Sequence, residues 1–427
     1  MQQMQYDRMK ETLYYEKLEN GLQIYVLPKP GFQKTYATFT TLFGSIDNRF
    51  QIADGEIQHV PDGIAHFLEH KMFEEPTGDI FSTFATQGAS ANAFTSFDRT
   101  TYLFSATERI NENIETLLNF VQNPYFTDEN VEKEKGIIGQ EITMYQDHPD
   151  WRSYFGLIQA LYNVYPIKID IAGTIESIAQ ISKETLYDCY HTFYHPENML
   201  LFIVGGVDPE KMIQMVSDNQ AKKKVVPQSE IKRYFDLEPE HVNQKLKIIE
   251  LPVSLPKWLL GFKETKSGLI GEELLKKELE TKVMLDAIFS SSSVLYQNLY
   301  NAELISDQFG YEYQVTPDYG FSIIGGDTKD PEKLEEFIRD TVLKIKKEGI
   351  SEKDFERSRK KKLGTYLRTL NSPEAIANEF TKYRFKKIDF FNVADTYEMI
   401  TLQDINNRLH EHFDWDRSAV SIVRSPS

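Results

Sequence analysis

The second half of this 427-residue chain repeats the pattern of its first half. The segment FTDENVEKEKGIIGQEITMYQDHPDW, which starts at Phe126, aligns without gaps with ISEKDFERSRKKKLGTYLRTLNSPEA, which starts at Ile350, 224 residues later (350 − 126). A second pair also aligns: ISKETLYDCYHTFYHPENMLLFIV from Ile181 and ITLQDINNRLHEHFDWDRSAVSIV from Ile400. Repeats of this length predict two similar domains of about 200 residues each.

Runs rich in β-branched and aromatic residues alternate with segments of helical periodicity in both halves. Examples of the strand-like runs are GLQIYVLP (21–28), KTYATFTTLFGS (34–45) and the pair ASANAFTSF and TTYLFSAT. We therefore expect an α+β fold in which each domain is a mainly antiparallel sheet covered by helices. The polar, lysine-rich segment between the halves predicts domains at 1–222 and 241–427, joined by a linker at 223–240.

Composition narrows the class of function. The net charge of −17 and the pI of about 5.1 argue against a nucleic-acid binder, which needs a basic surface. Cys189 is the single cysteine, so internal disulfides are excluded. No stretch approaches the ~20 apolar residues of a membrane span, and the N-terminal segment is too polar for a signal peptide. These features predict a cytoplasmic protein.

The motif HFLEH places His66 and His70 four residues apart in a segment that is expected to be helical. Residues at this spacing project from one side of a helix, so two imidazole nitrogens can hold one metal ion at about 2.0–2.1 Å. Glu69 is displaced by one residue, where it can act as a general base on a water beside the ion. The alternative is a polar helix face without metal. We expect this helix to begin near Gly63, with Asp62 as its cap.

A zinc hydrolase needs a third protein ligand and one open position. The segment EKEKGIIGQE offers Glu134 and Glu141, which are seven residues apart and so share one face of a helix. If this helix packs against the HFLEH helix, Glu141 can complete the site and Glu134 can accept a hydrogen bond from an imidazole N–H. At the repeat offset the second half has Ser358 and Thr365 in these places and lacks HxxEH, so we expect metal in the first domain only.

HFLEH followed by E-x6-E on a later helix resembles the pattern of the insulinase/pitrilysin family of zinc peptidases. The stretch GASANAFTSFDRTTYLFSA (88–106) is also similar to the family. The resemblance covers nearly the whole chain, duplication included, and is greatest to the short bacterial members of the YmfH type. It implies one zinc per chain and a pair of domains that forms half of a clamshell chamber.

The resemblance also implies roles for individual residues. The implied metal and catalytic residues are His66, His70 and Glu141 as zinc ligands, Glu69 as general base and Glu134 as supporting catalytic acid. In the family, the strand that matches SANAF is an edge strand that takes an extended peptide by main-chain pairing. Asn92 and Ala93 match its substrate-facing positions, with a satisfied turn or strand residue as the alternative for Asn92.

One part of the family pattern is absent. Active members use an Arg and a Tyr from the second domain, with the Arg seven residues before the Tyr, to hold substrate and stabilise the oxyanion. The matching stretch LISDQFGYEYQV offers Tyr311 or Tyr313, but no arginine lies between Arg233 and Arg339. Some short bacterial members pair as heterodimers in which only one subunit carries zinc. We therefore expect this chain to be the zinc-bearing subunit of a heterodimer with a four-domain chamber; the alternative is a homodimer.

The sequence leaves three classes of function open. The first is a zinc endopeptidase that processes leader or targeting peptides or degrades short ones. The second is a catalytically silent structural subunit of a peptidase-like complex, although such subunits usually lose a ligand or the base. The third is a metal-dependent amidase acting on a small molecule, which the duplicated fold and the SANAF strand argue against.

Overall fold

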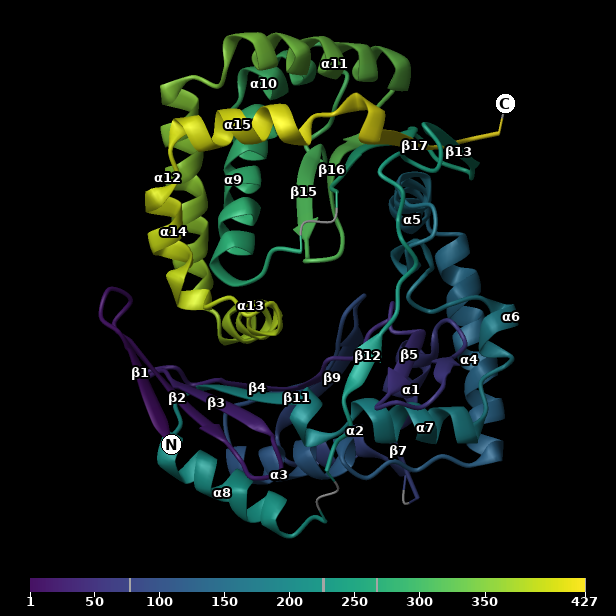
Figure 1. Cartoon of the computed structure of the whole chain (residues 1–427), viewed down its shortest axis with the longest axis vertical. Helices are drawn as coiled ribbons and strands as arrows, with labels where there is room; N and C mark the ends of the chain where they lie inside the picture. The colour runs from purple at the N-terminus through teal and green to yellow at the C-terminus, as the bar shows by residue number, and fades with distance from the viewer. Residues whose placement is uncertain (77, 225–226, 266–267, 427) are drawn as a thin grey trace. The chain divides into compact units, whose positions relative to one another are not determined.

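The computed structural model describes residues 1–76, 78–224, 227–265 and 268–426. The chain forms two compact units, drawn together in Figure 1. Unit 1 comprises Met1–Ile142, Ile169–Phe235 and Leu370–Lys382, and unit 2 comprises Thr143–Lys168, Asp236–Thr369 and Tyr383–Ser427. The units are interleaved, so the contiguous domains at 1–222 and 241–427 expected from the sequence do not describe them.

Unit 1 is built on a seven-stranded sheet. The strand order is β1 (Gln2–Tyr6), β2 (Glu11–Lys17), β3 (Gln23–Pro28), β11 (Met199–Gly205), β4 (Thr35–Thr41), β10 (Thr100–Ala106), β9 (Ala89–Thr95). β11 runs parallel to β3, and all other neighbours are antiparallel. β4 and β11 are buried along their whole length, as expected for central strands rich in apolar and β-branched residues. β9 is an edge strand.

Helices cover this sheet on both faces. α3 (Ile110–Val121) and α8 (Pro209–Ala221) pack on one face, where Ile114, Leu117, Leu118 and Val121 form the buried stripe of α3 (Figure 1). That stripe follows the i, i+3, i+4, i+7 spacing of an amphipathic helix. The other helices of this unit are α1 (Ile64–Met72), α2 (Ile80–Thr86), α4 (Asp128–Gln146, in unit 1 to Ile142), α6 (Ile175–Ile178), α7 (Lys183–Phe193) and the 3-10 turn Pro196–Asn198.

Unit 2 repeats the same sheet in five strands. The order is β13 (Leu246–Glu250), β17 (Ser418–Arg424), β14 (Lys257–Lys263), β16 (Gly320–Asp327), β15 (Gly310–Val315), and only β13 and β17 are parallel. This order reproduces β3-β11-β4-β10-β9 of unit 1, so the duplicated α+β fold predicted from the sequence is confirmed. Its helices are α9 (Gly271–Phe289), α10 (Val294–Asn301), α11 (Pro331–Glu348), α12 (Glu352–Thr369), α14 (Val393–Met399) and α15 (Leu402–His412), with 3-10 turns at Pro166–Lys168, Phe390–Asn392 and Trp415–Arg417.

Each sheet is covered by a helix from the other half of the sequence. α5 (Pro149–Leu161) packs on β13, β14 and β17 of unit 2. α13 (Pro373–Phe385) lies on the sheet of unit 1, where the ring of Phe380 is 5.0 Å from Tyr25 and 4.5 Å from Phe202. The two helices are equivalent in the repeat, so each half exchanges the same element. This exchange explains why the units are not contiguous.

The segment expected to be a linker is part of unit 1 up to Phe235. Its strand β12 (Ile231–Arg233) pairs with β5 (Arg49–Ile52), which also pairs with β6 (Ile57–His59). The guanidinium Nε of Arg233 donates to the buried Asp47 carboxylate at 2.6 Å. The remaining two-stranded sheet is β7 (Glu74–Glu75) with β8 (Gly78–Asp79). Among the described helices, none combines the length and apolar character needed to cross a membrane.

Candidate metal centre

Helix α1 carries the HFLEH motif and is held by its apolar face. Ile64, Phe67, Leu68 and Met72 are buried in the core of unit 1. Their spacing places the two histidines of the motif on the opposite side of the helix. The side chains of His66 and His70 are only 12% and 27% exposed, so they do not lie on a freely solvated helix face.

The N-terminus of α1 is set by a glycine. Gly63 has φ of 86°, and a Cβ at this position would lie 2.4 Å from the carbonyl oxygen of Ala172, so a side chain would be both strained and crowded. The expectation that Asp62 caps the helix is wrong, because no side chain caps this end. The Asp62 carboxylate instead accepts a hydrogen bond from Asn48 Nδ2 at 2.8 Å.

The three predicted ligands converge. Nε2 of His66 lies 3.7 Å from Oε1 of Glu141, and Nε2 of His70 lies 3.5 Å from Oε2 of Glu141. One nitrogen or oxygen from each residue lies within 4.8 Å of the other two. The histidines come from successive turns of α1, and Glu141 comes from α4, so these two helices meet as the sequence predicts.

This donor set fits a zinc ion. Two imidazoles and a carboxylate at zinc bond lengths of about 2.0–2.2 Å are expected to stand about 3.4 Å apart in a tetrahedral site, close to the observed separations. Burial and the neighbouring His70 lower the pKa of His66 to about 3, so its imidazole is neutral and free to ligate. Among the described residues, no other group of three ligating side chains converges in this way.

Glu134 lies on α4 about two turns before Glu141 and supports the centre from there. Its Oε1 lies 3.0 Å from Nδ1 of His70, the hydrogen-bonding contact that the sequence predicts. Burial works against protonation of His70, but this hydrogen bond and the nearby carboxylates outweigh it and raise the pKa of that imidazole. The other oxygen of Glu134 lies 3.8 Å from Nζ of Lys71, which is fully buried and also contacts Glu74.

Glu69, the predicted general base, lies close enough to His70 and Glu141 for their charges to act on its carboxyl group. Its side chain is almost entirely buried, and Oε2 accepts a 2.6 Å hydrogen bond from the Thr95 hydroxyl. Burial raises the pKa of Glu69 to about 7, while the Thr95 hydrogen bond opposes the rise. A carboxyl group with such a pKa can take up and release a proton near neutral pH.

Thr95 and Lys71 are the site residues that sequence reasoning missed. Thr95 is the last residue of β9, directly after ASANAF, and β9 packs beside α1. Lys71 lies three residues after Leu68, on the buried face of α1, where an ammonium must find an acceptor. That position is the signal that could have identified Lys71. Nothing in the sequence indicates which carboxylate Thr95 contacts, because the two are brought together only by tertiary packing.

The predicted peptide-binding residues lie on β9. Asn92 is exposed, and its Oδ1 accepts a hydrogen bond from the backbone N–H of Ala93 at 2.9 Å. The N–H of Ala93 therefore points away from the neighbouring strand β10. Because backbone groups alternate along a strand, the odd-numbered residues of β9 present their N–H and C=O groups at the open edge. The edge strand expected from the sequence is present.

Tyr311 and Tyr313 belong to unit 2, and neither hydroxyl is free. Tyr313 is buried and its hydroxyl donates to Oε1 of Glu264 at 3.2 Å. The Tyr311 hydroxyl donates to Oδ1 of Asp286. Both carboxylates are buried, and burial raises the pKa of each phenol well above its ordinary value. These contacts do not support the substrate-binding role predicted for either tyrosine.

Two family profiles match the chain. The profile described as insulinase (peptidase family M16) matches residues 50–175, and the profile described as peptidase M16 inactive domain matches residues 180–362. Together with the duplicated α+β fold and the two-histidine, one-glutamate cluster, these matches define the class as M16-type zinc peptidases. The residues of the metal cluster lie within the first matched segment and outside the second.

Individual relatives and solved structures that resemble this chain agree with this class. The uncharacterized zinc protease YmfH of Bacillus subtilis (strain 168) is 53% identical over 421 residues, which cover 98% of either chain. A crystal structure of a protein described as an M16-like peptidase, from Alicyclobacillus acidocaldarius, has a TM-score of 0.95 at 40% identity over 97% of this chain and 99% of that one. The first half of the periplasmic protease PqqL from Escherichia coli shares the fold, with a TM-score of 0.77 at 19% identity over 100% of this chain and 94% of that one. The chain belongs to the insulinase (peptidase M16) family, as the sequence motifs predicted.

Proposed function

We propose that this chain is a zinc-dependent endopeptidase with its active site at His66, His70 and Glu141. The observation that carries the proposal is the convergence of these three donors beside Glu69. The zinc proteases among its relatives support the same reading. No observation specifically supports a metal-dependent amidase. The open edge of β9 also argues against it, because such an edge suits an extended chain rather than a small molecule.

Zinc at these donors would act as a Lewis acid that acidifies a water and polarises the scissile carbonyl. Glu69 takes the proton of the attacking water and returns it to the leaving amine. Thr95 holds the Glu69 carboxylate in one orientation. Glu134 fixes His70 with Nδ1 as the protonated nitrogen, which would leave Nε2 free to bind the ion. An extended substrate pairs with the edge of β9 near Asn92 and Ala93, which brings one peptide bond to the centre.

The experiment is to compare the purified chain with its Glu69→Gln variant. Metal analysis should find about one zinc per chain in both proteins, because Glu69 is not a ligand. Cleavage of a quenched fluorescent peptide should fall by a factor of about 10² or more in the variant, because the base is lost. A wild-type chain without zinc would support the silent structural subunit instead. Equal cleavage by both proteins would exclude Glu69 as the base.

The proposal includes a partner chain. The region that should supply the oxyanion arginine has none, and the hydroxyls of Tyr311 and Tyr313 are engaged with buried carboxylates. The match to the first half of PqqL supports a need for a second half, because this chain covers only 48% of the longer PqqL chain. We therefore infer a heterodimer in which a related subunit contributes the Arg/Tyr pair and helps to enclose the peptide.

Pairing is tested by assaying the chain alone and with a related subunit from the same genome. Since oxyanion donors are worth a factor of about 10²–10³ in rate, the mixture should cleave far faster than either chain alone. Equal rates for the chain alone and the mixture would contradict the heterodimer and leave the homodimer. The substrate could be a leader peptide that is processed or a short peptide that is degraded. Assaying both kinds of peptide with the chain, alone or paired, whichever cleaves faster, tests this.

A further inference from the structure

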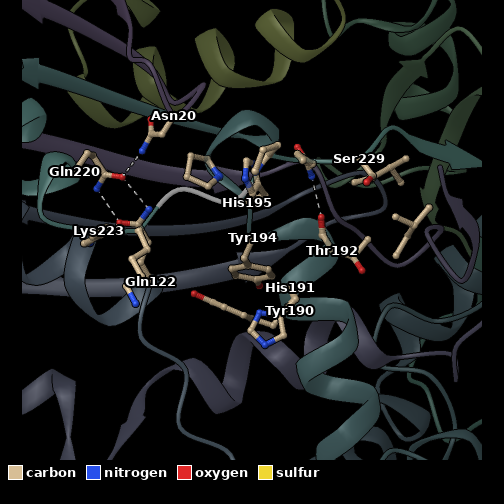
Figure 2. A pocket seen from close by; sticks show the side chains of 16 residues that line it. Asn20, Gln122, Tyr190, His191, Thr192, Tyr194, His195, Gln220, Lys223 and Ser229 are labelled. Atoms are coloured by element: carbon tan, nitrogen blue, oxygen red, sulfur yellow. Dashed lines mark hydrogen bonds between the residues drawn. The ribbon is translucent and has the colours of Figure 1, made fainter.

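Unit 1 contains a pocket that none of the metal-centre residues lines. It has a volume of about 570 Å³ and lies where the C-terminal ends of α3, α7 and α8 meet the segment before β12. Figure 2 shows Asn20, Gln122, Gln220 and Lys223 gathered at one side, with Thr192 and Ser229 at the other. Pockets of this size with a few polar groups in one corner are typical of small-molecule sites.

The polar corner is a network of side-chain amides. Gln220 Nε2 donates to Gln122 Oε1 at 2.8 Å, and Gln122 Nε2 donates back to Gln220 Oε1 at 3.2 Å. Asn20 Nδ2 also donates to Gln220 Oε1, at 3.0 Å, and Asn20 Oδ1 accepts from the Leu22 backbone. The amide oxygens that line this corner are therefore already occupied by donors from the protein.

Lys223 adds a positive charge without a carboxylate partner. Its ammonium donates to Gln122 Oε1 at 2.5 Å and to the Leu118 carbonyl at 3.2 Å, both neutral acceptors. Within the described part of the chain, no carboxylate forms an ion pair with it. Burial lowers the pKa of Lys223 to about 8, and Glu115 opposes this only through a longer-range charge. A half-buried ammonium in such surroundings gains from an anion.

A count of donors shows what the corner can still bind. A side-chain amide carries two N–H groups and an ammonium three. In hydrogen bonds to the described residues, Asn20 and Gln122 each use one amide N–H. Lys223 uses two of its three ammonium N–H groups. Each of the three therefore keeps one donor, whereas the oxygens of the corner are taken. The corner can offer hydrogen bonds but has little capacity to accept them.

We propose that this pocket binds a small organic anion, with its carboxylate or phosphate group held by Lys223, Gln122 and Asn20. The rest of the ligand would lie against the apolar wall, where the rings of Tyr190 and Tyr194 are stacked at 5.0 Å. A flat or aromatic body suits that wall. The proposal does not depend on the peptidase activity, because the pocket shares no residue with the metal centre.

Calorimetric titration of the full chain with matched probes tests this site. Hippurate and phenyl phosphate offer an aromatic body with a carboxylate or a phosphate, and hippuramide is the neutral counterpart of hippurate. At least one of the two anions should bind once per chain, and hippuramide should bind more weakly by about tenfold or more, since a charge-assisted hydrogen bond is lost. The stronger anion identifies the preferred group. Failure of both anions to bind at millimolar concentration would overturn the proposal.

Variants of Lys223 test whether the anion binds in this pocket. Lys223→Gln should weaken the anion by about tenfold or more, whereas Lys223→Arg should retain binding. Lys222→Gln is the matched control, because Lys222 is the exposed neighbour that does not line this pocket. Should Lys223→Gln fold poorly, the unmodified chain gives a second readout: the bound anion should slow reductive methylation of Lys223 but not of Lys222. Unchanged binding in Lys223→Gln, or equal methylation with and without the anion, would show that Lys223 only caps the end of α3.

Discussion

Nδ1 of His70 lies 3.0 Å from Oε1 of Glu134, on the side of the ring away from Glu141. The Glu134 carboxylate therefore accepts a hydrogen bond from Nδ1–H, which leaves Nε2 unprotonated on the side of Glu141. A residue that is not itself a donor to the ion thus decides which nitrogen of His70 can be one. Helix α4 thus carries one predicted ligand, Glu141, and also Glu134, which orients a second predicted ligand, His70.

Glu134→Gln should weaken zinc binding by about tenfold to hundredfold while leaving His66, His70 and Glu141 in place. The amide can still contact Nδ1 but does not stabilise the protonated nitrogen as a carboxylate does. Competition with a chelator of known affinity measures the change. Glu132→Gln is the matched control, because Glu132 is an exposed acid on the same helix. Equal affinities in the two variants would show that Glu134 does not orient the ligand.

Lys71→Met tests the ion pair behind Glu134. The ammonium is fully buried and lies near both Glu74 and Glu134, so its removal leaves carboxylates without their cation. We expect a loss of about 2 kcal/mol in the free energy of unfolding, together with weaker zinc binding. In the double variant with Glu134→Gln, the two effects on zinc affinity should be less than additive, because both act through one carboxylate. Strict additivity would show that Lys71 contributes to packing alone.

The residues of the metal cluster could be predicted because each helix carries its pair at a local spacing, whereas the expectation that the two helices meet rested on the family resemblance. His66 and His70, four residues apart, project from one side of their helix. Glu134 and Glu141, seven residues apart, likewise lie on one face of theirs. The exchange of α5 and α13 could not be predicted in the same way. Both are short amphipathic helices of the repeat, and an apolar face does not specify which of two similar sheets it covers. Thr95 was missed for a related reason, since its contact with Glu69 depends on how β9 and α1 pack.

Thr95→Val should reduce peptide cleavage by about tenfold without loss of zinc. The valine preserves the volume of the side chain but removes the 2.6 Å hydrogen bond that orients Glu69. The ligands are untouched, so metal content and unfolding temperature of the zinc form should stay close to those of the wild type. Steady-state kinetics should show the loss in kcat rather than KM, because the base acts in the chemical step. Full activity in the variant would mean that Glu69 needs no such support.

A buried group in unit 2 resembles a hydrolytic triad but should be inert. The Ser322 hydroxyl lies 2.8 Å from Nε2 of His412, whose Nδ1 lies 2.7 Å from Glu264. Ser322 is fully buried on a central strand, so no substrate can reach it. The native protein should therefore not react with a fluorophosphonate probe, and Ser322→Ala should retain peptidase activity. Labelling of Ser322 in the folded chain would contradict this expectation.

The same group should make unit 2 sensitive to acid. Burial lowers the pKa of His412. Burial would raise the pKa of Glu264, but Arg408, His412 and Lys277 together outweigh it and hold the pKa of that carboxyl well below its ordinary value. Both folded-state pKa values are depressed, so the unfolded state binds more protons. The free energy of unfolding should thus be greatest above pH ~6.5, the unperturbed value for histidine, and fall as the pH drops, first through His412 and below about 4.5 through Glu264.

Hydrogen exchange in peptides from α15 and β16 measures this effect within unit 2 alone. Between pH 7 and 5 the protection free energy should decrease with a slope of up to about 1.4 kcal/mol per pH unit for the one proton taken up by His412. His412→Gln should be less stable at pH 7, because contacts with Ser322 and Glu264 are altered, but its slope over this range should be smaller. His410→Gln is the control, since His410 is exposed on the same helix. Equal slopes in the wild type and His412→Gln would assign the acid sensitivity to other groups.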